Sequence, residues 1–214
     1  MDLSSRFYVY LESLDTGNTP LLDTIEQEAR EGGVPVIRKE TQRFLRTLLA
    51  MKKPTAVLEV GTAIGFSSLL MCTFSDAHIT TIENYAPRIP IARKNFERAG
   101  FADRITLLEG DAAEILPGLT GPYGLIFLDA AKGQYLHFLP ELVRLLPPGG
   151  VLLADNCLQE GAVLDPHWAA ERRDRTIWKR MREFLFELTH SEQLETSILP
   201  VGDGLALSVR RETT

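Results

Sequence analysis

The sequence has few cysteines and lacks the features that mark membrane-spanning or secreted proteins. Only two cysteines occur among 214 residues, Cys72 and Cys157, and they form no C-x-x-C pair. We therefore expect neither a disulfide framework nor a zinc site. No apolar run approaches the roughly 20 residues that cross a bilayer. The N-terminal segment carries Asp2, Arg6 and Glu12 where a signal peptide would be apolar. These absences predict a cytoplasmic protein without membrane contact.

An excess of basic residues is also missing. The chain carries 23 Lys and Arg against 29 Asp and Glu, a formal net charge of −6, so its overall charge does not favour nucleic acid. Hydrophobic residues make up 44% and charged residues 24%, which is ordinary for a globular protein. We find no repeat, low-complexity tract or long linker, and we expect residues 1–214 to form one domain.

The first 52 residues are predicted to be helical. Apolar side chains recur at helical spacing over residues 3–14. Thr19 and Pro20 form a typical helix start, and Gly32-Gly33 a typical stop. A third helix is predicted over about 38–51. We expect the helices of residues 1–52 to cover the cofactor and substrate site.

From residue 56 onward, strand-like and helix-like segments alternate. Short apolar runs predict strands at 56–60, 78–82, 105–108, 125–128 and 151–154. Helical patterns are found at about 66–74, 87–99, 111–116, 134–146 and 170–189. Two segments, 195–199 and 205–209, flank a turn and predict a hairpin. This order predicts an α/β fold with seven strands, five parallel and then a pair, covered by helices on both faces.

A glycine-containing turn follows the first predicted strand, with the sequence E-V-G-T-A-I-G-F-S over residues 59–67. Gly61 would let a ligand approach the backbone at the carboxyl end of the strand. Ala63 stands where the dinucleotide fingerprint G-x-G-x-x-G needs glycine, and no P-loop pattern fits. A plain tight turn is the alternative interpretation.

Two acids follow the next two predicted strands. Glu83 lies near the spacing from Gly61 at which an acid can accept hydrogen bonds from both ribose hydroxyls of a nucleoside. A solvated acid at a strand end is the alternative. Asp111, followed by Ala112, opens a helix, where it can serve as an N-cap or bind an adenine amino group. Spacing alone leaves both roles of Asp111 open.

Polar residues also follow the fourth and fifth predicted strands. Asp129 begins D-A-A-K, which ends at Lys132, and Asp155 precedes Asn156. Adjacent strand ends lie about 5 Å apart, so these side chains can converge. Two carboxylates and an amide oxygen suit Mg²⁺, and Lys132 beside them is a candidate general base. The alternative is that these are ordinary turn residues.

Together these motifs resemble the cation-dependent class I O-methyltransferases of the catechol and caffeoyl-CoA type. The resemblance extends from about Pro35 to Ser208 and includes the glycine turn, the T-I-E strand end, the D-x-x-K and D-N pairs, and the P-V-G-D-G hairpin. It implies a Rossmann-like methyltransferase fold that uses S-adenosyl-L-methionine and Mg²⁺ or another divalent cation. It also implies a homodimer, which is usual in that family.

The resemblance also assigns roles to individual residues. The residues implied to bind the cofactor are Ile37, Glu59, Gly61, Ser67, Glu83, Asp111, Ala112 and Asp129. The implied metal ligands are Asp129, Asp155 and Asn156. Lys132, the proposed base, and Asp129 are the implied catalytic residues.

A narrower resemblance concerns the acceptor. The segments 62–65, 129–135 and 198–204 look like those of bacterial tRNA 5-hydroxyuridine methyltransferases, which make 5-methoxyuridine at the anticodon wobble position. Plant caffeoyl-CoA enzymes usually carry an acid within D-x-x-K, where this chain has Ala130 and Ala131. In 5-hydroxyuridine, as in a catechol, two vicinal oxygens could chelate a metal. The resemblance thus implies the tRNA anticodon region as partner.

A basic cluster in the predicted helix near residue 180 could hold phosphates. Its members are Arg172, Arg173, Arg175, Lys179, Arg180 and Arg182. A solvated helix face is the alternative interpretation. Arg38 and Lys39 could add to such a patch, or simply begin a helix.

Three other functions compete with tRNA methylation. The first is a small-molecule O-methyltransferase for catechol-like or caffeoyl-CoA-like phenols. The second is a nicotinamide-dependent oxidoreductase, which the missing G-x-G-x-x-G and the Asp155-Asn156 pair oppose. The third is a cofactor-binding protein without activity, which the presence of Lys132 and the three metal ligands opposes.

Overall fold

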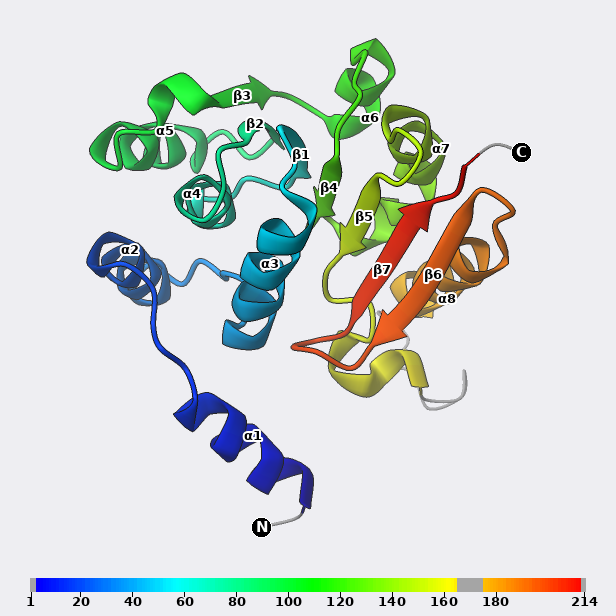
Figure 1. Ribbon diagram of the computed structural model, residues 1–214, viewed down its shortest axis with the longest axis horizontal. Coiled ribbons are helices and arrows are strands. Elements are labelled where there is room, and N and C mark those ends of the chain that lie inside the picture. Colours follow the sequence, from blue (N-terminus) through cyan, green and yellow to red (C-terminus); the bar gives the residue numbers. More distant parts are fainter. Residues whose placement is uncertain (1–2, 165–174, 213–214) are drawn as a thin grey trace.

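The computed structural model describes residues 3–164 and 175–212. In these residues seven strands form one sheet in the order β3-β2-β1-β4-β5-β7-β6 (Figure 1). The strands are β1 Ala56–Val60, β2 His78–Glu83, β3 Ile105–Glu109, β4 Leu125–Leu128, β5 Val151–Ala154, β6 Leu194–Leu199 and β7 Leu205–Arg210. The sheet is the Rossmann-like methyltransferase arrangement that the sequence predicted.

The sheet is parallel from β3 to β5 and antiparallel beyond. β1 pairs with β2 and β4, β2 with β3, and β4 with β5, all in parallel. β7 runs antiparallel to both β5 and β6. The predicted division into five parallel strands and a hairpin is confirmed. The hairpin places its second strand next to β5, which leaves β6 at the edge of the sheet.

The helices begin and end within a few residues of the predicted positions, as boundary assignments usually do. They are α1 Leu3–Ser13, α2 Pro20–Glu31, α3 Lys39–Lys52, α4 Phe66–Thr73, α5 Ile89–Arg98, α6 Ala112–Ile115, α7 Tyr135–Leu145 and α8 Arg175–His190. The predicted N-cap is confirmed, because the Thr19 hydroxyl accepts a hydrogen bond from the Leu22 amide at 3.4 Å. Residues 170–174 of the predicted helix 170–189 lie outside the described residues.

The core consists of two apolar layers, one on each face of the sheet. Successive strand side chains point to opposite faces, so Val57 packs with the layer under α2 to α5, while Leu58 packs with the layer under α6 to α8. Phe127 and Ile126 of β4 divide in the same way. Both faces of the central strands are therefore buried, which explains their continuous apolar runs.

Helix α1 differs from the others, because it extends away from the rest of the molecule (Figure 1). The side chains of Phe7, Tyr10, Leu11 and Leu14 are exposed. The Leu11 carbonyl accepts a hydrogen bond of 2.6 Å from the Arg43 guanidinium of α3. The helix predicted over residues 3–14 is thus confirmed, but its apolar residues do not face this chain's own core.

Within residues 3–164 and 175–212, no helix is both long and apolar enough to span a membrane. The parallel strands β1 to β5 all end at the same edge of the sheet, as parallel pairing requires. The predicted turn and the predicted acids follow these ends, and the fold therefore gathers them at one edge.

Candidate active site

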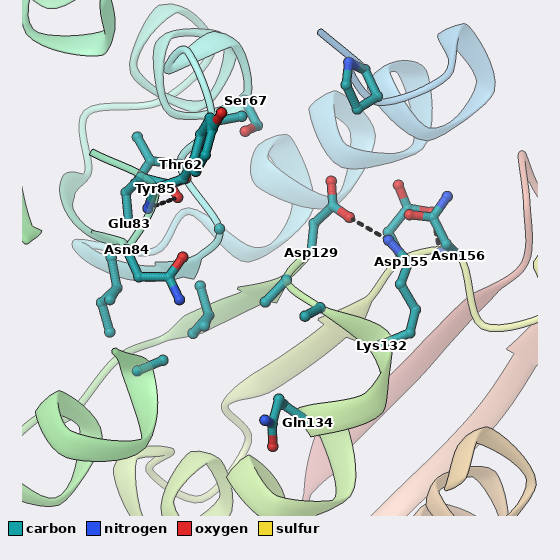
Figure 2. A pocket seen from close by; sticks show the side chains of 18 of the residues that line it. Thr62, Ser67, Glu83, Asn84, Tyr85, Asp129, Lys132, Gln134, Asp155 and Asn156 are labelled. Carbon is teal, nitrogen blue, oxygen red and sulfur yellow. Dashed lines mark hydrogen bonds and ion pairs between the residues drawn. The ribbon is translucent and has the colours of Figure 1, made fainter. Parts of the chain in front are cut away.

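A cavity of about 1180 Å³ opens at the carboxyl edge of the sheet. Its wall contains ten of the predicted site residues: Ile37, Gly61, Ser67, Glu83, Asp111, Ala112, Asp129, Lys132, Asp155 and Asn156. Of the first 52 residues, those in the wall are Pro35 to Arg38, between α2 and α3. Figure 2 shows Thr62, Glu83 and Tyr85 on one side of the cavity, and Asp129, Lys132 and Asp155 on the other. The cavity therefore has two ends. We call the end at the glycine turn and Glu83 the turn end, and the end at Asp129 and Asp155 the acidic end.

The turn after β1 packs directly on the end of β4. Gly61 has φ +107°, and a Cβ added there would overlap the carbonyl oxygen of Asp129. Gly65 has φ +85°, and a Cβ there would overlap the ring of Phe96. Both positions require glycine for space as well as for backbone conformation. The turn is thereby held against Asp129, the first residue of the acidic end.

Both carboxylate oxygens of Glu83 accept hydrogen bonds from the backbone. Its Oε2 accepts a hydrogen bond from the Ala63 amide at 2.7 Å, and its Oε1 accepts one from the Tyr85 amide at 2.8 Å. The residue is buried, since its relative exposure is 8%. A carboxylate offers about four acceptor sites, so two remain for ribose hydroxyls. The geometry agrees with the predicted role.

Glu59 takes a different place from the other predicted residues, because it is fully buried behind the turn and does not line the cavity. The hydroxyls of Ser68 and Thr81 both donate to its Oε2, Thr81 at 2.6 Å, while its Oε1 has no hydrogen-bond partner among the described residues. Burial raises the pKa of Glu59 to about 7, although hydrogen bonds from neighbouring hydroxyls oppose the shift. Glu59 can act on a cofactor through the turn that it supports.

Sequence reasoning missed Ser68 and Thr81. Thr81 is the register partner of Glu59 in the neighbouring strand β2, and its hydroxyl lies 2.6 Å from that of Thr62 in the turn. A predicted register between the first two strands could have revealed this pairing. Ser68 carried no signal beyond its position next to Ser67.

Asp111 acts as the N-cap of α6. Its Oδ1 accepts a hydrogen bond from the Ala113 amide at 2.9 Å. The capping alternative is therefore confirmed. Asp111 and Ala112 also line the cavity, so the predicted contact with adenine stays a prediction that the geometry permits.

At the acidic end, one lysine faces two carboxylates (Figure 2). Lys132 Nζ donates to Asp129 Oδ1 at 3.3 Å. Asp155 is almost fully buried, and its Oδ1 accepts a hydrogen bond from the Asn156 amide at 2.7 Å. Burial and the repulsion of Asp129 raise the pKa of Asp155 to about 7. The buried negative charge is therefore not fully compensated by the protein.

Asn156 is oriented by the hairpin between β6 and β7. It has φ +55°, a conformation that asparagine tolerates. Its Nδ2 donates to Asp203 Oδ2 at 3.5 Å, which leaves the amide oxygen available for a cation. The P-V-G-D-G hairpin, whose role the sequence did not reveal, thus contributes Asp203 to this end of the cavity.

These residues fit a hard divalent cation. No group of three or more His, Cys, Asp or Glu side chains that could hold a metal occurs in residues 3–164 and 175–212. A site here would therefore combine Asp129 and Asp155 with the Asn156 amide oxygen, and water or substrate oxygens would complete it. A cation would also favour the ionised form of Asp155, whose pKa is raised by burial and by the neighbouring charge of Asp129.

The basic cluster of α8 lies at the rim. Arg180 lines the main cavity, and its guanidinium donates to the Gly133 carbonyl at 3.0 Å. With Arg175 and Lys179, it also lines a second hollow of about 400 Å³. Arg182 is turned elsewhere, over the ring of Trp178 and toward the Val163 carbonyl. Arg172 and Arg173 lie outside the described residues.

Residues 19–211 match the profile of a family described as O-methyltransferase. The chain is 31% identical to a catechol O-methyltransferase of Niastella koreensis, over 84% of this chain and 85% of that protein. It is 30% identical to a catechol O-methyltransferase of Mycobacterium tuberculosis, over 94% of each. It is 33% identical to caffeoyl-CoA O-methyltransferase 1 of Eucalyptus globulus, over 78% of this chain and 72% of that protein.

Solved structures agree with these similarities. A structure described as a putative caffeoyl-CoA O-methyltransferase from Staphylococcus aureus superimposes with a TM-score of 0.87 at 29% identity, covering 98% of this chain and 100% of that one. An O-methyltransferase from Streptomyces achromogenes, solved in complex with S-adenosylmethionine, gives a TM-score of 0.84 at 25% identity, covering 99% of this chain and 100% of that one.

Proposed function

Because the chain belongs to the O-methyltransferase family, we propose that it transfers the methyl group of S-adenosylmethionine to an acceptor hydroxyl with the help of a divalent cation. One observation carries the proposal. A single cavity holds both the Glu83-fastened turn and the acidic pair with Lys132 (Figure 2). Neither a nicotinamide oxidoreductase nor an inactive binding protein would need the acidic end of the cavity.

The turn end would hold the cofactor. Gly61, Ser67 and Ile37 line the cavity, and there the glycine backbone, the Ser67 side chain and the backbone near Ile37 would surround its methionine part. Glu83 would accept the ribose hydroxyls, and Asp111 with Ala112 would face the adenine. The S-adenosylmethionine complex of the Streptomyces achromogenes relative supports this choice of cofactor.

The acidic end would hold the acceptor. Asp129, Asp155 and Asn156 would bind Mg²⁺, whose Lewis acidity makes a hydroxyl easier to deprotonate. Lys132 Nζ, in its neutral amine form, would take up the hydroxyl proton. The acceptor oxygen then bonds to the methyl carbon as the carbon–sulfur bond breaks, and S-adenosylhomocysteine leaves. Much of the rate enhancement would come from holding the two reactants in line.

For the acceptor we propose 5-hydroxyuridine at the tRNA wobble position. Its two vicinal oxygens suit a cation at the acidic end, and Arg175, Lys179 and Arg180 at the rim supply positive charge for phosphates. The second candidate is a catechol-like phenol, which offers the same pair of oxygens. The names of the relatives favour it.

A direct competition separates the two acceptors. The protein is incubated with S-adenosylmethionine and Mg²⁺, and with either catechol or tRNA isolated from a strain that lacks the gene. Mass spectrometry then measures methylated product. Formation of 5-methoxyuridine, together with accumulation of 5-hydroxyuridine in the deletion strain, is the expected result. Methylated catechol with an unchanged tRNA profile would show that the acceptor is the small phenol and not tRNA. No product from either acceptor would contradict both proposals.

We also propose a homodimer in which a second copy covers α1. This helix extends from the domain with Phe7, Tyr10, Leu11 and Leu14 exposed (Figure 1), and exposed apolar groups of this kind favour association. Light scattering should give the mass of two chains, and Phe7→Ser with Tyr10→Ser should give that of one. A monomeric unaltered protein would refute the dimer.

A further inference from the structure

The hydroxyl of Tyr135 lies between the ends of β4 and β5. It is within hydrogen-bond distance of two backbone carbonyls, those of Leu128 and Asp155, each at 3.2 Å. A phenol has one proton to donate, so the bond is shared between the two carbonyls. The side chain is fully buried. Tyr135 therefore donates to these carbonyls from inside the protein, out of contact with solvent.

The two carbonyls belong to the segments that carry the proposed metal ligands. Leu128 ends β4 and directly precedes Asp129, whereas Asp155 directly follows β5. The last ladder bond between these strands is from the Asp155 amide to the Leu128 carbonyl, at 3.0 Å. The next residue of β4's end, Asp129, donates its amide to Val60 of β1, and no later backbone bond between the ends of β4 and β5 is seen in the described residues. The phenol thus bridges the strands where their own pairing stops.

The Asp155 carbonyl has little else to hold it. No backbone amide of the described residues donates to it, and its other neighbour is the Cys157 thiol at 3.8 Å, a weak donor. The Tyr135 ring is itself fixed by edge contact with Phe184, at 5.3 Å between ring centroids. Tyr135 is therefore a rigid support for one carbonyl that carries a proposed ligand.

We propose that Tyr135 is a positioning residue for the cation. Its hydroxyl fixes the separation between the backbones of Asp129 and Asp155, and through them the two carboxylates. The inference rests on the proposed function, because it needs a cation at these residues. Groups that orient metal ligands without touching the metal typically contribute 10- to 100-fold in metal affinity. Tyr135 is not among the described residues that line the cavity.

The Tyr135→Phe variant removes the hydroxyl and keeps the ring. Ser208→Ala is the matched control, because Ser208 is also fully buried in the sheet, and its hydroxyl bonds to that of Thr196 at 2.8 Å, away from the strand ends. Mn²⁺ is titrated into the full-length protein, and the electron paramagnetic resonance of free Mn²⁺ gives the dissociation constant. Calorimetry measures S-adenosylmethionine binding, and thermal unfolding checks that each variant is folded.

The expected result is that Tyr135→Phe weakens Mn²⁺ binding by roughly 10-fold or more, with unchanged cofactor affinity and unchanged Mn²⁺ affinity in Ser208→Ala. In turnover assays, a high Mn²⁺ concentration should then restore the activity of Tyr135→Phe. Two results would overturn the inference while leaving the metal site in place: wild-type Mn²⁺ affinity in Tyr135→Phe, or an equal loss in Ser208→Ala. If the unaltered protein binds no Mn²⁺, the metal part of the proposed function fails, and this inference fails with it.

Discussion

The backbone amide of Ala63 donates a 2.7 Å hydrogen bond to Oε2 of Glu83, so the turn after β1 and the acid after β2 form one unit. Ala63 has φ +47°, an uncommon conformation for alanine. The bond helps to stabilise that conformation. Glu83 therefore has two tasks, since it shapes the turn and presents its remaining acceptor sites to the cavity.

Replacing Glu83 by Gln should weaken S-adenosylmethionine binding. The amide keeps the shape, but it removes the negative charge that would strengthen hydrogen bonds from the ribose hydroxyls. Losing a charge-assisted hydrogen bond costs about 1.5–3 kcal/mol, or roughly 10- to 100-fold in affinity. Calorimetry measures the effect. Glu109→Gln is the control, because Glu109 is the register partner of Glu83 and lies outside the cavity wall. Equal affinities in both variants would contradict the ribose role.

Replacing Gly61 by Ala should destabilise the protein more than the same change at Gly33. Both glycines have positive φ, but a Cβ at Gly33 meets no atom within 4 Å, whereas at Gly61 it would overlap the Asp129 carbonyl. Gly33→Ala should therefore cost only the backbone strain of about 1–2 kcal/mol. Urea unfolding compares the two free energies. A similar loss in both would show that the turn can move away from β4.

The free energy of unfolding should fall as pH rises from about 4.5 to 7. In the unfolded chain Glu59 ionises near the ordinary glutamate pKa of 4.5, while burial raises its pKa to about 7 in the folded protein. Over this window the unfolded state loses its proton first, so the folded state loses stability, by about 3 kcal/mol at most. Urea unfolding across the window should show a smaller slope for Glu59→Gln. An identical slope would mean that Glu59 does not cause it.

Mg²⁺ should stabilise the unaltered protein but not the Asp155→Asn variant. A ligand that binds only the folded state at 100 times its dissociation constant adds about 2.7 kcal/mol, and Asp155 is a proposed ligand. Thermal unfolding with and without Mg²⁺ measures the difference. The exposed Asp103→Asn serves as control. Stabilisation of the Asp155→Asn variant to the same extent would place the cation elsewhere.

Replacing Lys132 by Ala should slow methyl transfer without weakening cofactor binding. A positioned proton acceptor typically contributes about 10²- to 10⁴-fold in rate, and Lys132 lies at the acidic end, 3.3 Å from Asp129. Single-turnover rates at saturating acceptor test this, and Lys94→Ala, on the exposed side of α5, is the control. A rate within the range of the control would remove Lys132 from the mechanism.

The sequence predicted the strand ends well, because each buried strand is a short apolar run and the residue after it is polar or glycine. Asp129, Asp155 and Glu83 could be found from that rule alone. Thr81 and Tyr135 could not, because their roles depend on which strands are neighbours and in what register. The sheet order is set by packing between segments distant in sequence.

Two other features were beyond the reach of periodicity. Helical spacing in α1 shows which residues share a face, but not what covers that face, and here the chain itself leaves it exposed. Glu59 shared a motif with Gly61, yet strand alternation turns its side chain into the interior and away from the cavity. The motif therefore located the turn correctly, but it did not distinguish residues that line the cavity from residues that support the turn from behind.

The hairpin of β6 and β7 has a consequence for the order of assembly during synthesis. The Cys157 amide bonds to the Gly204 carbonyl at 2.8 Å, and the Leu158 amide to the Asp203 carbonyl at 3.0 Å. The acidic end thus depends on segments made long after β1 and β2. Because a domain generally folds as a unit, the acidic end can be completed only after residues 203 and 204 have been made. The complete cavity would therefore form only once the strands β6 and β7 are available.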